Sequence, residues 1–447
     1  MKKLTYLVIA VALGLCLAAP LPAADAKSAP EARTLFTNVN VFDGANEQLV
    51  ENAYVLVEGN LIEQVSTDAI AADGATVIDG DGRTLMSGII DPHVHIISGG
   101  STVSEILYGD PSYAIIQGVK QAELMLSLGV TTVRDLAGPV FGIKKAVDNG
   151  LIPGPRIYPS GAMISQTSGH LDFRSPNQEN PHLGGPTPTF QHAGYGVVVD
   201  GVPQMLSAAR EQLRLGATQV KLAIGGGVSS PTDPIDVTEF TKEEIAAAVA
   251  AAENWGTYVT VHGYTVRAIN QAIDAGVKVI DHGQLLDKPT LERMAEEGVW
   301  LSIQPFTECE EPGLSPAQNA KQAVVCQGTA HVYEWIKELP ELKVAHGTDI
   351  FLDPGDGYAG GVKQMERLLE WFTPYEILTM STSKPAELLK LSGPRNPYPN
   401  DLGVVKEGAY ADLLLVDGNP LEDLSAVTDS DNLRIIMKDG KIYKNSL

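Results

Sequence analysis

Hydrophobic and polar residues follow two different patterns along this chain, and the change between them separates its ends from its middle. Near both ends, short runs rich in β-branched and aromatic residues alternate with turn signals such as Asp43-Gly44 and Asp439-Gly440. The predicted strands cover residues 35–42, 54–58, 61–65 and 75–79, and then 411–416, 433–437 and 441–443. We expect both ends of the mature chain to pair into one small, discontinuous β-sandwich domain.

The middle of the chain alternates apolar, strand-like runs with helical periodicity. The predicted strands cover residues 84–91, 131–135, 156–160, 219–223, 258–262, 279–282, 300–304 and 343–349, and helices are predicted at 114–128, 202–215, 242–254, 266–275 and 289–297. Eight strands with intervening helices favour an α/β fold with a (β/α)8 TIM barrel. The alternative, an open doubly wound sheet, is weakened because no Gly-rich phosphate loop follows the first strand.

These patterns predict a domain order along the chain. The first part of the β-sandwich covers residues 27–83, the barrel covers 84–395, and the second part of the sandwich covers 396–447. Three long stretches without clear periodicity, at 165–199, 225–239 and 306–328, are predicted as loops. Long loops after barrel strands usually shape a substrate pocket.

The N-terminus has the pattern of a secretory signal peptide. Lys2 and Lys3 precede an apolar run over residues 4–19, and the small residues at 24–26 suit a cleavage site, so the predicted signal covers residues 1–26. The run is short for a stable membrane span, although a membrane anchor remains the alternative. We therefore expect an exported protein, periplasmic or secreted.

Composition narrows the possible partners and the redox chemistry. The 447 residues are 44% hydrophobic and 19% charged, which excludes a disordered chain. Lys+Arg number 32 against 55 Asp+Glu, a net charge of −23, so we expect neither nucleic acid nor, after signal cleavage, a membrane as partner. The mature chain keeps Cys309 and Cys326, and an oxidising compartment permits a disulfide between them. Two free thiols are the alternative.

Six polar residues fall at or near the carboxyl ends of predicted barrel strands, where this fold gathers catalytic groups. They are His93, His95, Lys221, His262, His282 and Asp349. His93 and His95 are two residues apart and therefore face the same way. Neutral imidazoles and a carboxylate suit zinc-like ions, and four histidines with one aspartate exceed one open tetrahedral site. The set therefore predicts a pair of divalent ions; the ligand types favour zinc, and manganese or cobalt could substitute.

Several motifs resemble those of the amidohydrolase superfamily. Residues 87–95 (SGIIDPHVH) resemble its metal signature, and residues 261–265 (VHGYT) and 280–283 (IDHG) resemble its fifth- and sixth-strand signatures. Residues 403–420 resemble the segment that closes its small β-sandwich. Residues 221–234 are typical of the exported, imidazolonepropionase-like branch, which includes Xaa-Pro and Xaa-Arg dipeptidases or carboxypeptidases. Ochratoxin-hydrolysing amidohydrolases look similar as well.

The resemblance implies a role for each candidate. His93, His95 and Asp349 would hold the more buried ion, His262 and His282 would hold the other, and Lys221, N6-carboxylated, would bridge the two. A cationic lysine beside two divalent ions would be unfavourable, whereas a carbamate is an anionic bridge. Asp349 would also accept the proton of the attacking water and deliver it to the leaving amine.

Several other polar or aromatic residues have both a functional and a purely structural interpretation. The resemblance implies that His170 faces the substrate carbonyl and supports the developing oxyanion, and that Tyr264 meets the substrate; the alternatives are a loop histidine and a packing tyrosine. We expect His346 to pack within its strand, and Arg134 and Asp135 to form a structural ion pair. His182, His192 and His331 resemble loop or surface residues.

The leading hypothesis is an exported binuclear-metal hydrolase that cleaves the amide bond of a dipeptide or an N-acyl amino acid by attack of hydroxide on a polarised carbonyl. The alternatives are an ochratoxin-type hydrolase of aromatic N-acyl amino acids, a cyclic-amide hydrolase like imidazolonepropionase, a deaminase, and a non-catalytic binding protein. Lys221 argues against a deaminase, because such relatives generally use one metal and lack this lysine. The complete ligand set argues against a binding protein. The resemblance also implies a homo-oligomer acting on a small-molecule substrate.

Overall fold

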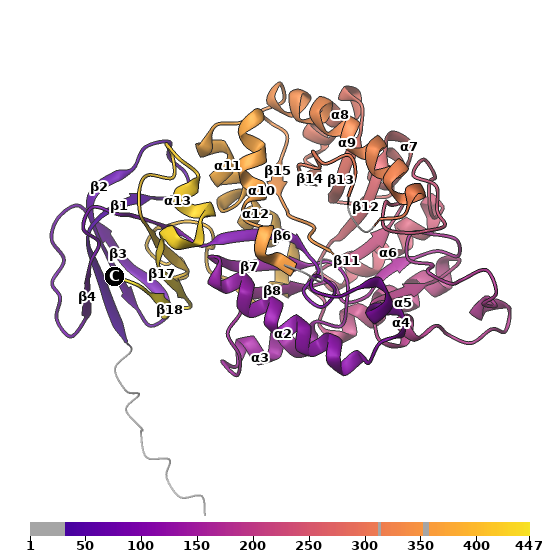
Figure 1. Ribbon diagram of the computed structural model, residues 1–447, viewed down its shortest axis with the longest axis horizontal. Helices are drawn as coiled ribbons and strands as arrows, with labels where there is room; N and C mark the ends of the chain where they lie inside the picture. The colour runs from indigo at the N-terminus through magenta and orange to yellow at the C-terminus, as the bar shows by residue number, and fades with distance from the viewer. Residues whose placement is uncertain (1–31, 312–313, 352–356) are drawn as a thin grey trace, which may run out of the picture.

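Strands from both ends of the chain pair into one eight-stranded sheet, which forms the β-sandwich (Figure 1). The computed structural model describes residues 32–311, 314–351 and 357–447, so the predicted signal peptide lies outside the described residues. The strand order is β18-β17-β16-β5-β1-β2-β3, with β4 paired to β1. The strands are β1 (Arg33–Phe42), β2 (Val50–Glu58), β3 (Leu61–Ser66), β4 (Thr76–Asp79), β5 (Thr84–Ser87), β16 (Leu413–Val416), β17 (Leu433–Lys438) and β18 (Lys441–Asn445).

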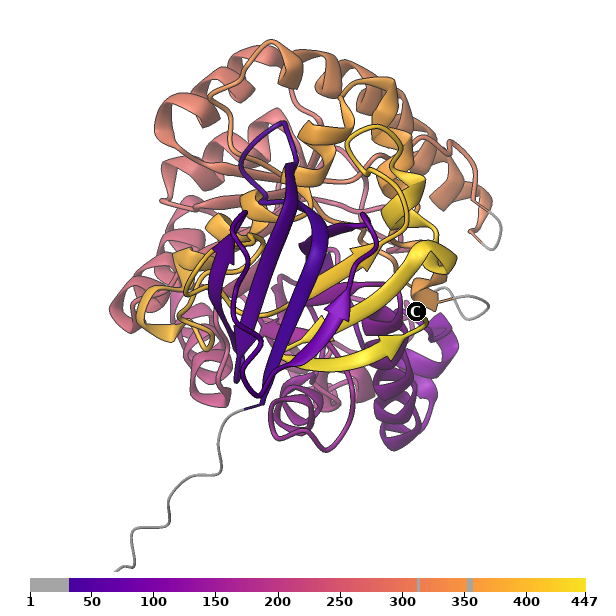
Figure 2. The ribbon, with the colours of Figure 1, turned by 90° about the vertical axis from the view of Figure 1, so that its left-hand side faces the viewer.

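The join between the two ends lies at β5. This strand pairs in parallel with β1 on one side and antiparallel with β16 on the other. Figure 2 shows the indigo strands of the N-terminal end beside the yellow strands of the C-terminal end. Alternate side chains of these strands, among them Phe36, Val55 and Leu413, are buried in one apolar core.

The second domain is a parallel barrel, as the sequence predicts. Its strands are β6 (Ile89–Val94), β7 (Val130–Asp135), β8 (Arg156–Pro159) continued by β9 (Met163–Ser165), β11 (Val220–Ala223), β12 (Val259–Thr265), β13 (Val279–Leu285), β14 (Trp300–Ile303) and β15 (Val344–His346). Neighbouring strands pair in parallel. The backbone N–H of Asp349 donates to the carbonyl of His93 at 2.9 Å, which links the end of the last strand to the first. The fold class is therefore confirmed as a TIM barrel with a β-sandwich.

Helices cover the outside of the barrel (Figure 1). The longer ones are α2 (Pro111–Ser127), α3 (Phe141–Asp148), α5 (Val202–Leu215), α6 (Lys242–Trp255), α7 (Val266–Asp274), α8 (Lys288–Glu297), α9 (Pro316–Lys337), α11 (Pro374–Met380) and α12 (Ser383–Leu389). Short segments are α1 (Val103–Tyr108), α4 (Thr189–His192), α10 (Gln364–Arg367), α13 (Ser425–Thr428) and β10 (Gly196–Val198). Their buried apolar faces, such as Ala248 and Ala252 of α6, join the main core around the barrel.

The single strand predicted over residues 84–91 is wrong. The structure divides this segment at Gly88 into β5, which belongs to the sandwich sheet, and β6, which opens the barrel. A side-chain methyl at Gly88 would overlap the side chain of Thr131. The chain therefore passes from one domain to the other at a residue without a side chain.

The loop predicted over residues 306–328 is partly wrong, because α9 begins at Pro316. Ser315 caps this helix: its hydroxyl accepts from the N–H of Gln318, and the Gln318 side chain accepts in return from the N–H of Ser315. Serine, proline at the first helical position and glutamine three residues after the cap are readable start signals that the apolar periodicity alone does not reveal. The predicted disulfide joins Cys309 to Cys326 of α9, with Cα atoms 5.1 Å apart.

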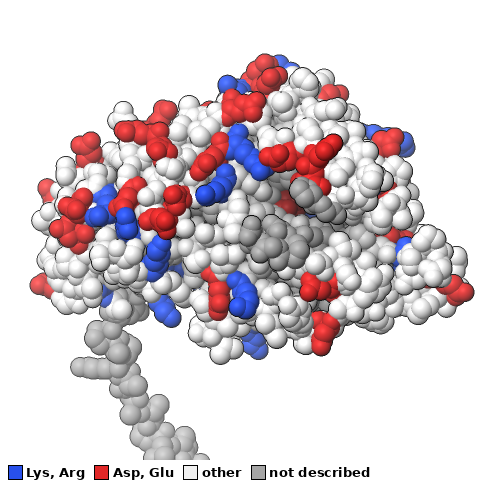
Figure 3. All heavy atoms as spheres, in the orientation of Figure 1, with Lys and Arg blue, Asp and Glu red and all other residues white. Residues whose placement is uncertain are grey.

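Charge is distributed over both domains. Figure 3 shows acidic side chains scattered across this face, with the fewer basic side chains among them and no continuous basic stripe. Within the described residues, no helix is both long enough and apolar enough to cross a bilayer.

Candidate active site

Each of the six predicted ligands is positioned by a barrel strand. His93 lies in β6 and His95 just beyond it, and Lys221, His262 and His282 lie in β11, β12 and β13. Asp349 follows β15 by three residues. The four histidines and Lys221 are buried, and 16% of the Asp349 side chain is exposed. Asp349 therefore has access to the mouth of the barrel.

Asp349 gathers three of the histidines. Its Oδ1 lies 3.1 Å from Nε2 of His93 and 3.0 Å from Nε2 of His95. Its Oδ2 lies 3.8 Å from Nδ1 of His282. One ligand atom each from His93, His282 and Asp349 lie within 4.8 Å of one another, so these three can hold one metal ion.

His262 extends this cluster on one side. Its ring centroid is 4.5 Å from that of His282. On its other side it stacks on His170, with centroids 4.2 Å apart and planes 8° from parallel. Burial lowers the pKa of both His262 and His282 below its usual value, that of His282 to about 3. Both are therefore neutral near pH 7, the form that binds a metal.

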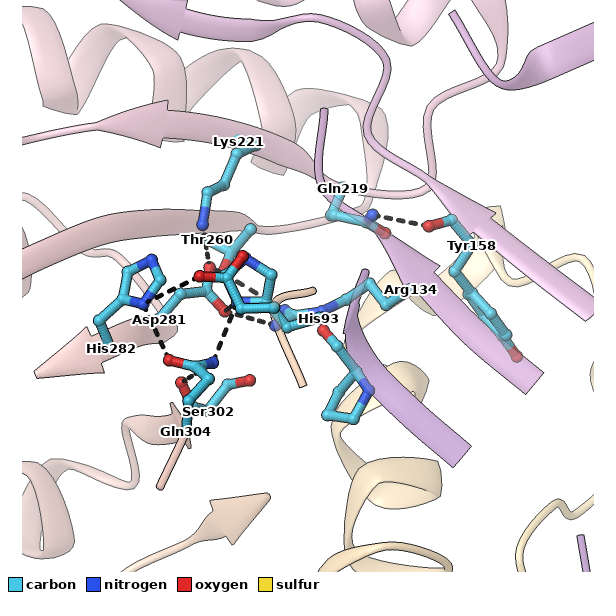
Figure 4. Close-up of polar contacts among 12 residues, drawn as sticks. His93, Arg134, Tyr158, Gln219, Lys221, Thr260, Asp281, His282, Ser302 and Gln304 are labelled. Carbon is cyan, nitrogen blue, oxygen red and sulfur yellow. Dashed lines mark hydrogen bonds and ion pairs between the residues drawn. The ribbon is translucent and has the colours of Figure 1, made fainter. Parts of the chain in front are cut away.

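Lys221 lies in the same interior but pairs with a residue that the sequence analysis did not select. Its ammonium makes an ion pair with Asp281 of β13, as Figure 4 shows. Burial lowers the pKa of Lys221, and Asp281 opposes that shift only in part. Asp281 Oδ1 also lies 3.6 Å from Nδ1 of His93, so the pair is adjacent to the ligand cluster.

The predicted ion pair between Arg134 and Asp135 is wrong. Arg134 donates instead to Asp281 at 2.6 Å and is completely buried, while Asp135 accepts from the backbone N–H of Ile96 at 2.8 Å. The side chains of adjacent strand residues point to opposite faces, so Arg134 faces the barrel interior with Asp281. The carboxylate of Asp281 accepts from Thr260 as well, at 2.6 Å.

Gln304, just past β14, is a second residue that the sequence analysis missed. Its Oε1 lies 2.8 Å from Nδ1 of His282, and its Nε2 lies 3.4 Å from Nδ1 of His93 (Figure 4). The side chain therefore orients two ligand histidines at once. The sequence contains a signal for this role, because Gln304 is a polar residue at the end of a predicted barrel strand, where functional side chains gather.

Backbone strain marks two of the ligands. His282 has φ +83° and Asp349 has φ +51°, the left-handed region that residues with a side chain rarely adopt. Such conformations cluster at functional sites, where the surrounding structure imposes them. Burial opposes ionisation of Asp349, but His93 and the other imidazoles outweigh it and hold its pKa well below its usual range. Asp349 is therefore an anion at neutral pH.

The remaining histidines and the tyrosine divide into two groups. The ring of Tyr264 is buried and lies 5.0 Å from that of His282, and His170 is buried against His262, so both border the cluster. His346 is buried in β15, and burial lowers its pKa to about 4. The three other histidines lie on elements that carry none of the predicted ligands. They are His182 in a short 3-10 turn, His192 in α4 and His331, which is exposed on α9.

The donor set fits divalent metal ions. Buried neutral imidazoles with an ionised carboxylate match the ligands of zinc and similar ions. Nδ1 of His95 is buried without a hydrogen-bond partner among the described residues, as expected of a ring placed for another purpose than packing.

Comparison with known proteins agrees with this geometry. A family model described as "Amidohydrolase family" matches residues 84–443. An ochratoxinase of Aspergillus niger is 29% identical over 374 residues, covering 80% of this chain and 75% of the relative. An imidazolonepropionase of Idiomarina loihiensis is 23% identical over 389 residues, covering 82% and 86%.

Solved structures extend the similarity. A prolidase complexed with N-methylphosphonate-L-proline has a TM-score of 0.85 at 34% identity, covering 93% of this chain and 100% of that one. A Xaa-Pro dipeptidase with bound methionine has a TM-score of 0.79 at 25% identity, covering 93% and 100%. The chain therefore belongs to the amidohydrolase family and is a hydrolase that acts on amide bonds.

Proposed function

We propose that this protein is an exported, binuclear-metal hydrolase that cleaves the amide bond of dipeptides or N-acyl amino acids. The observation that carries the proposal is the convergence of His93, His282 and Asp349 to within 4.8 Å, with His95 and His262 beside them. The similarity to a prolidase and to a Xaa-Pro dipeptidase supports a substrate whose released amino acid has a free carboxylate.

The ligand atoms divide into two sets in this proposal. His93, His95 and Asp349 would hold one ion, His262 and His282 would hold the other, and Lys221, once carboxylated, would supply an anionic ligand to both. Bound zinc ions would polarise the scissile carbonyl and lower the pKa of water. The lowered pKa of Lys221 supports carboxylation, because only the free amine reacts with CO2.

Proton transfer falls to Asp349 in this proposal. Its carboxylate is ionised, partly exposed to the mouth of the barrel, and within 3.1 Å of two imidazoles. It accepts a proton from the attacking water and passes it to the nitrogen of the leaving amine, which would otherwise depart as an unstable anion. His170 and Tyr264 border the space where the substrate carbonyl would lie.

Aromatic N-acyl amino acids are a second candidate substrate class. Phe351 lies 5.2 Å from the ring of His95 and Phe306 lies 6.4 Å from the ring of His282, so two aromatic side chains flank the cluster. The similarity to an ochratoxinase supports the same class. Aromatic acyl groups gain binding energy by packing against such rings.

Export is proposed from the apolar N-terminal run and from the Cys309–Cys326 disulfide, since disulfides persist in oxidising compartments. Assembly into a homo-oligomer remains a proposal from the family resemblance. Both are tested by N-terminal sequencing of the secreted protein and by light scattering.

The hydrolase proposal is tested by a library of dipeptides and N-acyl amino acids, with amine release and metal content measured on the same preparation. We expect hydrolysis of Xaa-Pro or aromatic N-acyl substrates and about two metal ions per chain. Lys221→Ala should abolish turnover and lower the metal content, while Lys242→Ala, on the exposed start of α6, should change neither. Undiminished activity of Lys221→Ala would exclude the bridging role, and selective cleavage of cyclic amides would replace the proposed substrate class.

A further inference from the structure

A buried carboxylate faces His170 that none of the proposed ligand roles uses. Asp233 is 1% exposed and His170 is 6% exposed. Oδ2 of Asp233 lies 3.4 Å from Nδ1 of His170. Neither Nδ1 of His170 nor Oδ1 of Asp233 has a hydrogen-bond partner in the described part of the chain. A buried polar atom without a hydrogen-bond partner destabilises the fold, and such atoms often mark a functional contact.

Two further contacts restrict the ring of His170. One face stacks on His262 at a centroid distance of 4.2 Å. A side-chain methyl at Gly227 would overlap the imidazole, so only glycine fits beside it. The N–H of Gly227 also donates to Oδ2 of Asp233 at 2.7 Å, which fixes the carboxylate relative to the ring.

Helix α9 holds the segment that contains Asp233. Nζ of Lys321 donates to the carbonyls of Gly227 at 3.0 Å and Ser230 at 2.8 Å, and lies 3.8 Å from Oδ1 of Asp233. One turn earlier, Nε2 of Gln318 donates to the carbonyl of Ser229 at 2.7 Å. The loop after β11 is therefore clamped from a helix that follows β14.

We propose that Asp233 is a positioning residue that orients the imidazole of His170, so that Nε2 of this ring faces the substrate carbonyl. Contact at Nδ1 leaves Nε2 as the nitrogen available to the substrate. Lys321 maintains the arrangement by holding the Asp233 loop. The 3.4 Å separation is compatible with this role, because catalytic contacts are often long without substrate and tighten when it binds. The inference rests on the proposed function, which places the substrate beside His170.

The experiment is a double-mutant cycle between Asp233→Asn and His170→Ala in the metal-loaded enzyme. We expect Asp233→Asn alone to lower kcat about ten- to hundredfold, as loss of a group that orients an active-site histidine does, with KM changed less than about threefold. In the His170→Ala background the same change should alter kcat less than about twofold, because the two residues act as a unit. Equal losses in both backgrounds would overturn the proposal.

A readout independent of turnover separates this inference from the proposed function. In protein labelled with 15N-histidine, the ring signals of His170 are identified by their loss in His170→Ala. We expect Asp233→Asn to shift them, whereas Asp172→Asn, which removes a buried carboxylate that pairs with Arg174 on the loop of His170 itself, should not. Unshifted signals would overturn the positioning role even in an active enzyme. A shift of the His170 ring signals in a protein that cleaves no amide would contradict the proposed function but not the positioning role.

A second variant guards against failure of Asp233→Asn to fold. Lys321→Met keeps a side chain of similar length but removes the ammonium that donates to the carbonyls of Gly227 and Ser230. We expect a severalfold fall in kcat and a shift of the His170 ring signals in the same direction. Wild-type kcat together with unshifted signals in this variant would contradict the clamp.

Discussion

Asp281 balances the charge of the barrel interior. Its carboxylate accepts from Arg134 and Thr260 and pairs with Lys221, all within the closed strands. Burial raises its pKa, but the two cations outweigh burial and hold the pKa well below its usual value. Because Arg134 stays cationic, Asp281 would keep one partner if the amine of Lys221 were carboxylated, as proposed.

Removing Arg134 tests this balance. We expect Arg134→Met to lower the free energy of unfolding by about 3–5 kcal/mol, because it leaves a buried carboxylate short of a partner. Chemical denaturation measures the loss. Adding Asp281→Asn to the same chain should return part of the stability, since the unpaired charge is then gone. Losses that simply add would show that the pairing does not matter.

Glu239 predicts a pH dependence of stability. Burial raises its pKa to about 8 from an ordinary value near 4.5. The folded chain therefore binds this proton more tightly than the unfolded chain, and the resulting stability, complete below about pH 4.5, is lost as pH rises toward 8. The whole effect is at most about 5 kcal/mol.

Glu239→Gln removes this titration. We expect the variant to gain stability relative to wild type as pH rises from 5 to 8, measured by urea denaturation at several pH values. Glu243→Gln, on the first turn of α6, is the matched control and should follow the wild-type curve. A difference between Glu239→Gln and wild type that does not change with pH would contradict the shifted pKa.

Sequence reasoning finds residues that stand at strand ends, and it misses partners whose importance depends on what lies across the barrel. His93, His95 and Asp349 follow apolar runs and were selected on that basis, and the structure brings them together. Asp281 looks like a neighbour of His282, and nothing local indicates that Arg134, 147 residues away, reaches it. Asp233 lies in a loop without periodicity. The metal and catalytic roles stay predictions.

At the scale of elements, the predicted and observed bounds agree best where amphipathic periodicity is strong. The helix predicted over residues 202–215 has those bounds as α5, whose last residue precedes Gly216 in the left-handed region. The 22-residue helix α9 is not among the predicted helices, and its first part lies in a predicted loop because that stretch is rich in glycine, proline and glutamine. Its capping box, rather than an apolar stripe, defines where it begins.

The disulfide fixes the loop after β14 to α9. We expect the free energy of unfolding of the Cys309→Ala/Cys326→Ala variant to be about 3 kcal/mol lower than that of the wild type. The bridge closes a loop over a sequence separation of 17 residues. Denaturation with and without reductant measures this. Reductant should destabilise only the wild type. If it destabilises both chains equally, the effect does not come from this bridge.

At the scale of the whole molecule, the proposed metal centre would link activity to stability. Ligands from β6, β12, β13 and the segment after β15 come from distant parts of the chain, so an ion that binds only the folded state stabilises it. We expect chelation to abolish turnover and to lower Tm. The free energy of unfolding should fall by about 4 kcal/mol if the ion was present at a thousand times its Kd.

Calorimetry of the chelated and the zinc-restored protein checks this expectation, with manganese and cobalt as further additions. Restored Tm without restored turnover would indicate a structural ion. An unchanged Tm on complete removal of metal, verified by elemental analysis, would contradict the proposed centre.

The position of β5 between β1 and β16 has a consequence for biosynthesis. Synthesis runs from the N-terminus, so one edge of β5 has no neighbour until residue 413 and those after it have left the ribosome. Until then the nascent polypeptide presents an open strand edge of the kind that invites association with other chains. The sandwich sheet therefore closes only once β16 has emerged, and a chain that stops before residue 413 would leave β5, in the middle of the sheet, with an open edge.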